Sequence, residues 1–137
     1  MDLTNILVIA GKPGLSELVS QTKGGAIVKN LTSGLKFPVF KNDRISSLGE
    51  IRIFTNTNEC PLQKVLQSIF TKLDGKETPF DPAKAESTIM FDLLSDTLPE
   101  YDHDRVHASD VKKIFSWYNI LLGAGKIDLE EEPNEEQ

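Results

Sequence analysis

His103 and His107 are the residues of the sequence whose type and spacing come nearest to a metal site. Residues four apart share one face of a helix, and imidazoles with a nearby carboxylate such as Asp102 can hold zinc or nickel. However, this segment lies between Pro99, which ends a helix, and Ser109, which starts one, so it is predicted to be a loop. Two histidines without a third evident ligand are a weak signal, and we therefore predict no metal and no cofactor.

Cys60 is the candidate nucleophile, because it precedes Pro61 at the start of a predicted helix. The helix dipole would lower the pKa of a thiol in this position. Neither histidine lies near Cys60 in the sequence, and a free cysteine usually packs as a small apolar side chain. Because Cys60 is the only cysteine, a disulfide within the chain and a cysteine-based zinc cluster are both excluded. We predict a half-buried structural residue and no catalytic site.

The segment Gly11-Lys12-Pro13-Gly14 has residue types found in phosphate-binding loops but not their spacing. No glycine precedes the glycine–lysine pair at the distance that a P-loop requires, and no serine or threonine follows the lysine. Pro13 also lacks the backbone N–H that such a loop would use. The segment is therefore predicted to be a turn.

Basic residues of the first half of the chain and one tryptophan form the candidate partner surface, which consists of Lys23, Lys29, Lys36, Arg44, Arg52 and Trp117. Basic side chains interleaved with aromatic ones are typical of a face that binds single-stranded nucleic acid. Residues 1–75 hold nine basic and six acidic residues, a small excess that favours an ordinary solvated surface. Trp117 lies off the apolar stripe of its helix, so it either packs against the rest of the protein, which we favour, or anchors a partner.

Charge is unevenly distributed over the 137 residues, whose net charge is −6. Residues 76–137 hold six basic and 15 acidic residues, and six of these acids lie in residues 127–137. This last segment has almost no apolar content and is predicted to be a disordered acidic tail. A solubilising role is the simpler interpretation, and competition with nucleic acid for the basic half is the alternative.

Residues 1–58 are predicted to form a small SH3-like β-barrel, as the first part of an α+β protein. Connections of about three residues that contain glycine separate apolar runs at 15–22, 26–31 and 35–40, as in β-hairpins. Pro38 has no N–H to donate, so its strand should lie at an edge of the sheet or carry a bulge. A helical turn near residues 46–49 and a strand that follows it complete the SH3-like order.

Three helices are predicted after the barrel, each identified by an apolar stripe at helical spacing. The first lies in residues 59–75 and packs on the barrel. The second runs from about residue 83 to 97 after a capping Asp81, and Ser109 is predicted to cap the third. The last two helices, within residues 81–126, are expected to form a helical hairpin.

Three groups of motifs together resemble one protein family: residues 11–14 with 18–23, residues 46–48 with 51–55, and residues 98–102 with 109–113 and the motif Trp117-Tyr118-Asn119. The chain is similar to a small family of uncharacterised proteins from Bacteroidetes, classed as a domain of unknown function, over nearly all its length except the acidic tail. The resemblance implies a β-rich N-terminal part, a helical C-terminal part and a bacterial cytoplasm. It assigns no catalytic or binding residue.

The residue patterns favour a protein that is not an enzyme, because they contain no catalytic constellation. We predict a cytoplasmic binding or adaptor protein that uses a surface of the barrel and the helices to bind another protein. A nucleic-acid-associated barrel protein, binding RNA or DNA, is the alternative, and an enzyme that uses the acidic loop ranks last. No membrane association is expected, since the apolar run at residues 6–10 is far too short to span a bilayer.

Overall fold

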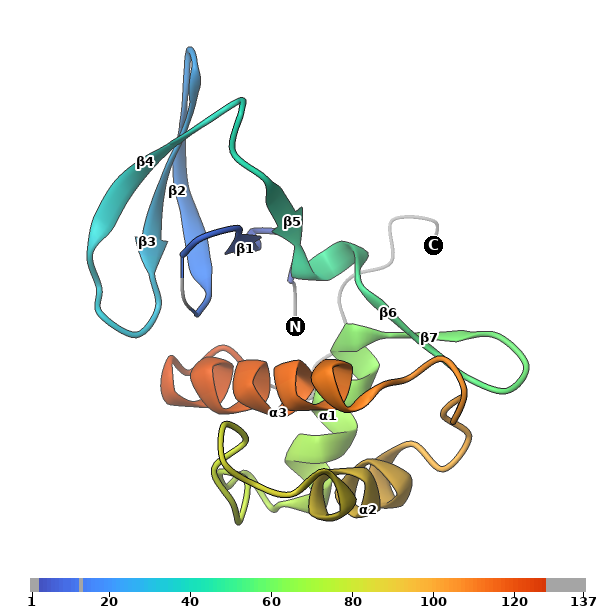
Figure 1. Ribbon diagram of the computed structural model, residues 1–137. Coiled ribbons are helices and arrows are strands. Elements are labelled where there is room, and N and C mark those ends of the chain that lie inside the picture. Colours follow the sequence, from blue (N-terminus) through green and yellow to red (C-terminus); the bar gives the residue numbers. More distant parts are fainter. Residues whose placement is uncertain (1–2, 13, 128–137) are drawn as a thin grey trace, which may run out of the picture.

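The computed structural model describes residues 3–12 and 14–127, which form an antiparallel sheet, a β-hairpin and a group of helices (Figure 1). The strands are β1 (Ile6–Ile9), β2 (Ser16–Thr22), β3 (Gly25–Asn30), β4 (Lys36–Phe40), β5 (Ile45–Ser47), β6 (Arg52–Phe54) and β7 (Glu59–Pro61). The helices are the short 3₁₀ helix η1 (Leu48–Glu50) and the α-helices α1 (Leu62–Lys72), α2 (Ser87–Thr97) and α3 (Ala108–Gly123). The predicted α+β class is confirmed, and the predicted acidic tail lies outside the described residues except for Ile127.

The first five strands form one antiparallel sheet in the order β4-β3-β2-β1-β5. Three of the predicted runs are β2, β3 and β4, and they pair as consecutive hairpins. The strand β5 was not predicted, and it pairs with β1 through Leu7 opposite Ser47. The sheet is open, because β4 and β5 are its two end strands and share no ladder within the described residues. The prediction of a closed SH3-like barrel is therefore wrong.

The outer edge of β4 carries two features that disfavour further pairing. Pro38 lies in this edge strand, as predicted from its missing N–H. The N–H of Phe40 donates to Asp43 Oδ2 at 2.7 Å, which removes another donor from the edge. Two of the outward N–H positions of β4 are thus unable to donate to a further strand, which disfavours pairing at this edge.

The segment that follows β1 is a turn, as predicted. Lys12 N–H donates to the carbonyl of Ile9 at 3.0 Å, and Gly11 has φ +82°, a conformation that glycine adopts without steric penalty. The Lys12 ammonium lies 5.4 Å from the centroid of the Phe37 ring on β4. This contact places the lysine over an aromatic ring of the sheet, where a cation–π attraction holds it.

Helix α1 buries the apolar stripe that was predicted for it, with Leu62, Val65, Leu66 and Ile69 on the inner face. The strand β7 leads directly into this helix, since it ends at Pro61. After the helix ends, Gly75 takes φ +74° and its N–H donates to the Phe70 carbonyl at 2.9 Å. A glycine in the left-handed conformation is a usual stop for a helix.

Helix α2 begins at Ser87, four residues later than predicted. Asp81 does cap a turn, because its Oδ1 accepts the N–H of Ala83 at 2.9 Å and its carbonyl accepts the N–H of Ala85 at 2.8 Å. That turn does not continue into the helix. The helix then buries Met90 and Leu94 against its neighbours α1 and α3.

Helix α3 begins at Ala108 with His107 as its N-cap, two residues before the predicted cap Ser109. The carboxylate of Asp110 accepts the His107 N–H at 3.0 Å, which satisfies a donor at the helix start and places a negative charge near the positive end of the dipole. The predicted stripe is buried, as Val111, Ile114, Phe115, Tyr118 and Leu121. Across residues 3–12 and 14–127, no helix combines the length and apolar character needed to cross a lipid bilayer.

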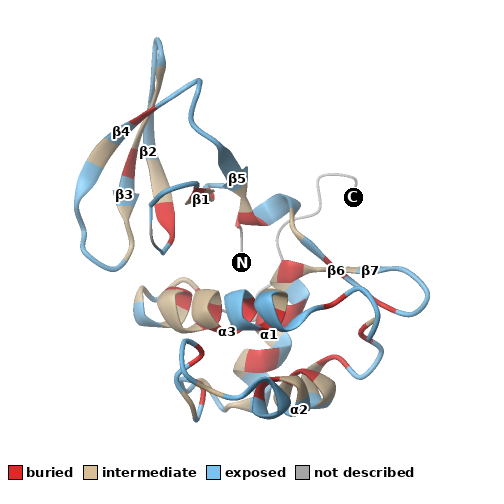
Figure 2. Ribbon diagram, viewed as in Figure 1, coloured by how far each residue is buried: buried red, intermediate tan, exposed pale blue. Residues whose placement is uncertain are grey.

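Most buried apolar residues belong to one core that the sheet and the helices share (Figure 2). Leu3, Leu15 and Leu48 enter it from the sheet side, and Phe115 and Leu66 enter it from the helices. A second, small cluster of Ile9, Val28 and Val39 lies within the sheet. The common core positions the hairpin of β6 and β7 beside the helices, and that junction contains the candidate site.

Candidate functional site

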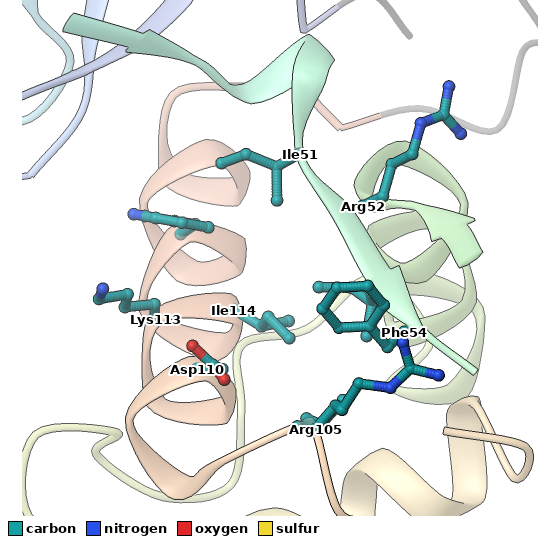
Figure 3. A pocket seen from close by; sticks show the side chains of 10 residues that line it. Ile51, Arg52, Phe54, Arg105, Asp110, Lys113 and Ile114 are labelled. Carbon is teal, nitrogen blue, oxygen red and sulfur yellow. The ribbon is translucent and has the colours of Figure 1, made fainter. Parts of the chain in front are cut away.

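A hollow of about 190 Å³ lies between β6, the loop that precedes α3, and α3 itself (Figure 3). Its lining residues are Ile51, Arg52, Ile53 and Phe54, then Arg105 and Val106, then Asp110, Lys113, Ile114 and Trp117. The four residues from α3 have spacings of three, one and three, so the helix presents them on one face. The strand supplies the opposite wall, because the shared core holds it next to the helix.

Apolar side chains form the floor of this hollow. Ile53 and Ile114 are buried in the main core, and Ile51 packs against it. Figure 3 shows Ile51 pointing from the strand side toward α3 and Ile114 pointing from α3 toward β6. Trp117 is half-buried against the same core, and it also lines the hollow. An occupant would therefore contact apolar side chains from both walls.

Arg105 is held in a fixed position at the rim. Its guanidinium lies 4.7 Å from the centroid of the Phe54 ring, and its Nε donates to Asp102 Oδ2 at 2.9 Å. The backbone N–H of Asp104 and the Arg105 side chain hold the pKa of Asp102 below its usual value. Asp102 is thus a carboxylate at neutral pH, and it orients an arginine that already stacks on an aromatic ring.

The rim carries more positive than negative charge. Arg52, Arg105 and Lys113 are its cations, and Asp110 is its one carboxylate among the lining residues. Asp110 is already engaged with the N–H of His107 at the start of α3. In Figure 3, Arg52 and Lys113 project away from the hollow on opposite sides. A chain with net charge −6 therefore presents a locally basic rim around an apolar floor.

The residues of the predicted partner surface do not lie together in the structure: two of them line the hollow and four do not. Arg52 and Trp117 come together at the hollow, although 64 positions separate them in the sequence. The other members do not line it, and these are Lys23, Lys29, Lys36 and Arg44. Arg105 and Lys113 belong to the site but were absent from the predicted surface.

Two of the remaining lysines form a second basic group on the sheet. Lys29 on β3 lies directly opposite Lys36 on β4, and both side chains are exposed. Lys23 lies in the connection between β2 and β3, at the far end of these strands. Arg44 lies in the connection between β4 and β5, where its carbonyl accepts the Ala10 N–H at 2.9 Å. Of the predicted partner surface, the sheet part thus carries one adjacent lysine pair and two separate basic residues, Lys23 and Arg44.

The two histidines have different surroundings. His103 stacks on Tyr101 with ring centroids 4.2 Å apart, and Tyr101 stacks in turn on Phe91 at 5.9 Å. His107 lies at the N-cap of α3, and both histidines are exposed. In the part of the chain that the structure describes, no three His, Cys, Asp or Glu side chains gather into a group that could hold a metal ion.

Cys60 is a partly buried residue of β7, packed against the main core as predicted. Burial, with a smaller contribution from the Glu100 carboxylate, raises the pKa of the Cys60 thiol above its ordinary value of 9.0. Its Sγ donates to the carbonyl of Pro61 at 3.7 Å. A thiol with a raised pKa is almost fully protonated at neutral pH, and this weakens it as a nucleophile.

Comparisons with known proteins place the hollow within one of two matched domains. The chain matches a domain of unknown function (DUF5606) over residues 3–48 and a domain of unknown function (DUF6852) over residues 51–121, and the second contains every lining residue. It is also similar to a structural-genomics target from Bacteroides vulgatus solved by solution NMR, with 36% sequence identity, a TM-score of 0.78, and coverage of 98% of this chain and 99% of that chain. None of the curated proteins matches the chain. The chain therefore belongs to the family of proteins in which these two domains of unknown function follow one another.

Proposed function

We propose that this protein is a non-enzymatic binding or adaptor protein of the cytoplasm that docks an acidic segment of a partner protein in the hollow between β6 and α3. The observation that carries the proposal is an apolar floor, formed by Ile53, Ile114 and Trp117, inside a rim of three cations. The proposal takes α2 and α3 as a helical hairpin whose second helix supplies one wall of the docking site.

The size of the hollow supports a side-chain anchor rather than a whole small-molecule substrate. Sites for drug-sized ligands and cofactors usually enclose roughly 300–1,000 Å³. A hollow of about 190 Å³ is smaller, and it suits one large apolar side chain. Partner proteins often place one such side chain in a well-packed pocket, where it supplies much of the binding energy.

The charges at the rim support an acidic partner segment. Arg52, Arg105 and Lys113 lie at the rim, where Asp110 is the one carboxylate among the lining residues and Arg105 is paired with Asp102 through its Nε. A guanidinium held over an aromatic ring, as Arg105 is over Phe54, loses little conformational freedom when it binds a carboxylate. Carboxylates on both sides of an apolar anchor would therefore find cations already in place.

The test uses Trp117 as its reporter, because it is the only tryptophan of the chain and lines the hollow. The probes are peptides of about nine residues with glutamates at both ends and a central leucine or phenylalanine. We expect a saturable change in tryptophan emission. Lys113→Glu should weaken binding about tenfold, because a rim cation is replaced by an anion.

Lys112→Glu is the matched control for this experiment. Lys112 is the exposed neighbour of Lys113 on α3, but it does not line the hollow, so its reversal should change affinity by less than about twofold. Equal losses in both variants would show that the peptides respond to the overall charge and not to the hollow. No emission change with any peptide would refute the proposed function.

Nucleic-acid association is the second candidate, and the pair of Lys29 and Lys36 is the observation that favours it. Two exposed lysines opposite each other on a sheet can contact neighbouring phosphates. Binding of a labelled oligouridine should then weaken steeply with salt, and Lys29→Ala with Lys36→Ala should lower the salt slope by about 1.4. An unchanged slope in the double variant would eliminate this surface.

A further inference from the structure

The strand β6 has two edges, and hydrogen bonds define which residues face each of them. On the side of β7, Leu62 N–H donates to the Ile51 carbonyl at 3.0 Å, and Thr55 N–H donates to the Asn58 carbonyl at 2.8 Å. Backbone groups alternate in direction along an antiparallel strand. The odd-numbered residues of this stretch therefore face β7, and the backbone groups of the even-numbered residues face the opposite edge.

The chain itself extends that opposite edge over part of its length. Asp102 N–H donates to the Phe54 carbonyl at 2.9 Å, and Asn56 N–H donates to the Glu100 carbonyl at 2.9 Å. These bonds form an antiparallel bridge of one residue pair. The chain then turns away, since the Asp102 carboxylate accepts the N–H of Asp104 at 2.8 Å in a tight turn. The edge thus accepts a strand at one end of β6.

Beside Arg52 the same edge has no strand partner in the described ranges 3–12 and 14–127. Arg52 lines the hollow, so its backbone N–H and carbonyl lie next to the proposed docking space. The edge of β4 is different, because Pro38 has no N–H and the Phe40 N–H is bonded to Asp43. Two donor positions are therefore missing at the outer edge of β4, whereas Arg52 keeps both a donor and an acceptor at the edge of β6.

We propose that the acidic partner segment binds as an added β-strand along the edge of β6 at Arg52, with one apolar side chain in the hollow. This inference rests on the proposed function and adds the conformation of the bound segment to it. The partner would donate to the Arg52 carbonyl and accept from the Arg52 N–H, continuing the edge that residues 100–102 already begin to cover.

An extended segment accounts for the shape and the charge of the site together. Side chains of a strand alternate between its two faces, so one apolar residue can enter the hollow while its neighbours point outward. The outward side chains would lie near Arg52 and Lys113, which project away from the hollow on opposite sides. Main-chain hydrogen bonds supply affinity and the pocket supplies selectivity, as in other cases of strand addition.

The first experiment modifies the peptide and leaves the protein unchanged. The probe is the glutamate-flanked peptide with a central phenylalanine, carrying a single N-methyl group at each backbone position in turn. Trp117 emission of the full chain measures affinity. In the added strand one peptide N–H donates to the Arg52 carbonyl, so we expect about tenfold weaker binding when that position is methylated and small changes at the other positions. Equal affinity across all positions would overturn strand addition.

The second experiment measures hydrogen exchange of the backbone amides by NMR on the full chain. With the unmodified peptide bound, we expect exchange of the Arg52 amide to slow about tenfold or more. If Trp117 emission responds but the Arg52 amide is not protected, strand addition is wrong and the proposed docking site remains. If neither responds, the proposed function itself fails, and the two results separate the two proposals.

Discussion

Gly25→Ala should lower the free energy of unfolding by about 3 kcal/mol, at the upper end of the usual penalty for overpacking. Gly25 begins β3 and lies opposite Phe40 on β4. A Cβ atom at this position would lie 1.9 Å from the carbonyl oxygen of Val39 and 2.9 Å from the Phe40 Cα. Both contacts are with backbone, so no side chain can rotate to relieve them, and the two strands must separate.

Gly24→Ala is the matched control, because Gly24 is the preceding residue in the same connection. No heavy atom lies within 4 Å of the Cβ that this change would add, and the free energy of unfolding should change by less than about 0.5 kcal/mol. Urea unfolding followed by far-ultraviolet circular dichroism measures both variants. Equal stabilities of Gly25→Ala and Gly24→Ala would show that β3 and β4 do not approach as closely as described.

Local patterns predicted those elements that are stabilised by neighbours in the sequence. The hairpin strands β2, β3 and β4 follow from turn residues between apolar runs, and the register of each pair is set by a short connection. The helices α1 and α3 were predicted from their stripes of apolar residues, most of which are buried in the core. These elements need little long-range information.

The elements that were not predicted from the sequence depend on pairing between residues that are distant in the chain. The strand β5 has only three residues and exists because Leu7, Val8 and Ile9 of β1 pair with it. Closure of the predicted barrel would likewise require pairing between distant strands, and the local pattern of each strand was compatible with either outcome. The pattern near Ser47 indicated a helical turn, and the 3₁₀ helix does follow it.

The candidate site could be predicted only in part, because its residues meet through tertiary packing. Arg52 and Trp117 were identified by residue type, but no spacing in the sequence relates a strand to the middle of a distant helix. Lys113 belongs to the same face of α3 as Ile114, which was assigned to the core. Arg105 was missed because it lies in a loop that is otherwise acidic. A single arginine in such a loop does not by itself indicate a binding site. Its position at the hollow follows from its stacking on Phe54, which only the structure shows.

Asn119→Leu should lower the free energy of unfolding by about 2–3 kcal/mol, because it breaks the attachment of the linker between α1 and α2 to α3. The Asn119 side chain accepts the N–H of Thr78 at 3.1 Å and donates to the Thr78 hydroxyl at 2.9 Å. Thr78 is buried, so leucine would leave its N–H without a partner. The neighbouring Tyr118 hydroxyl donates to the Lys76 carbonyl at 2.7 Å, and burial raises its pKa, which keeps the phenol protonated.

A double-mutant cycle with Thr78→Val separates this attachment from general packing. Thr78→Val removes the hydroxyl that Asn119 contacts, so the double variant should be more stable than the sum of the single losses implies, by about 1 kcal/mol. Additive losses would mean that the two side chains do not interact. Asn119 lies two residues beyond Trp117 on α3 but does not line the hollow. The response of Trp117 to the acidic peptides should therefore persist in the folded Asn119→Leu protein, because neither Asn119 nor Thr78 lines the hollow.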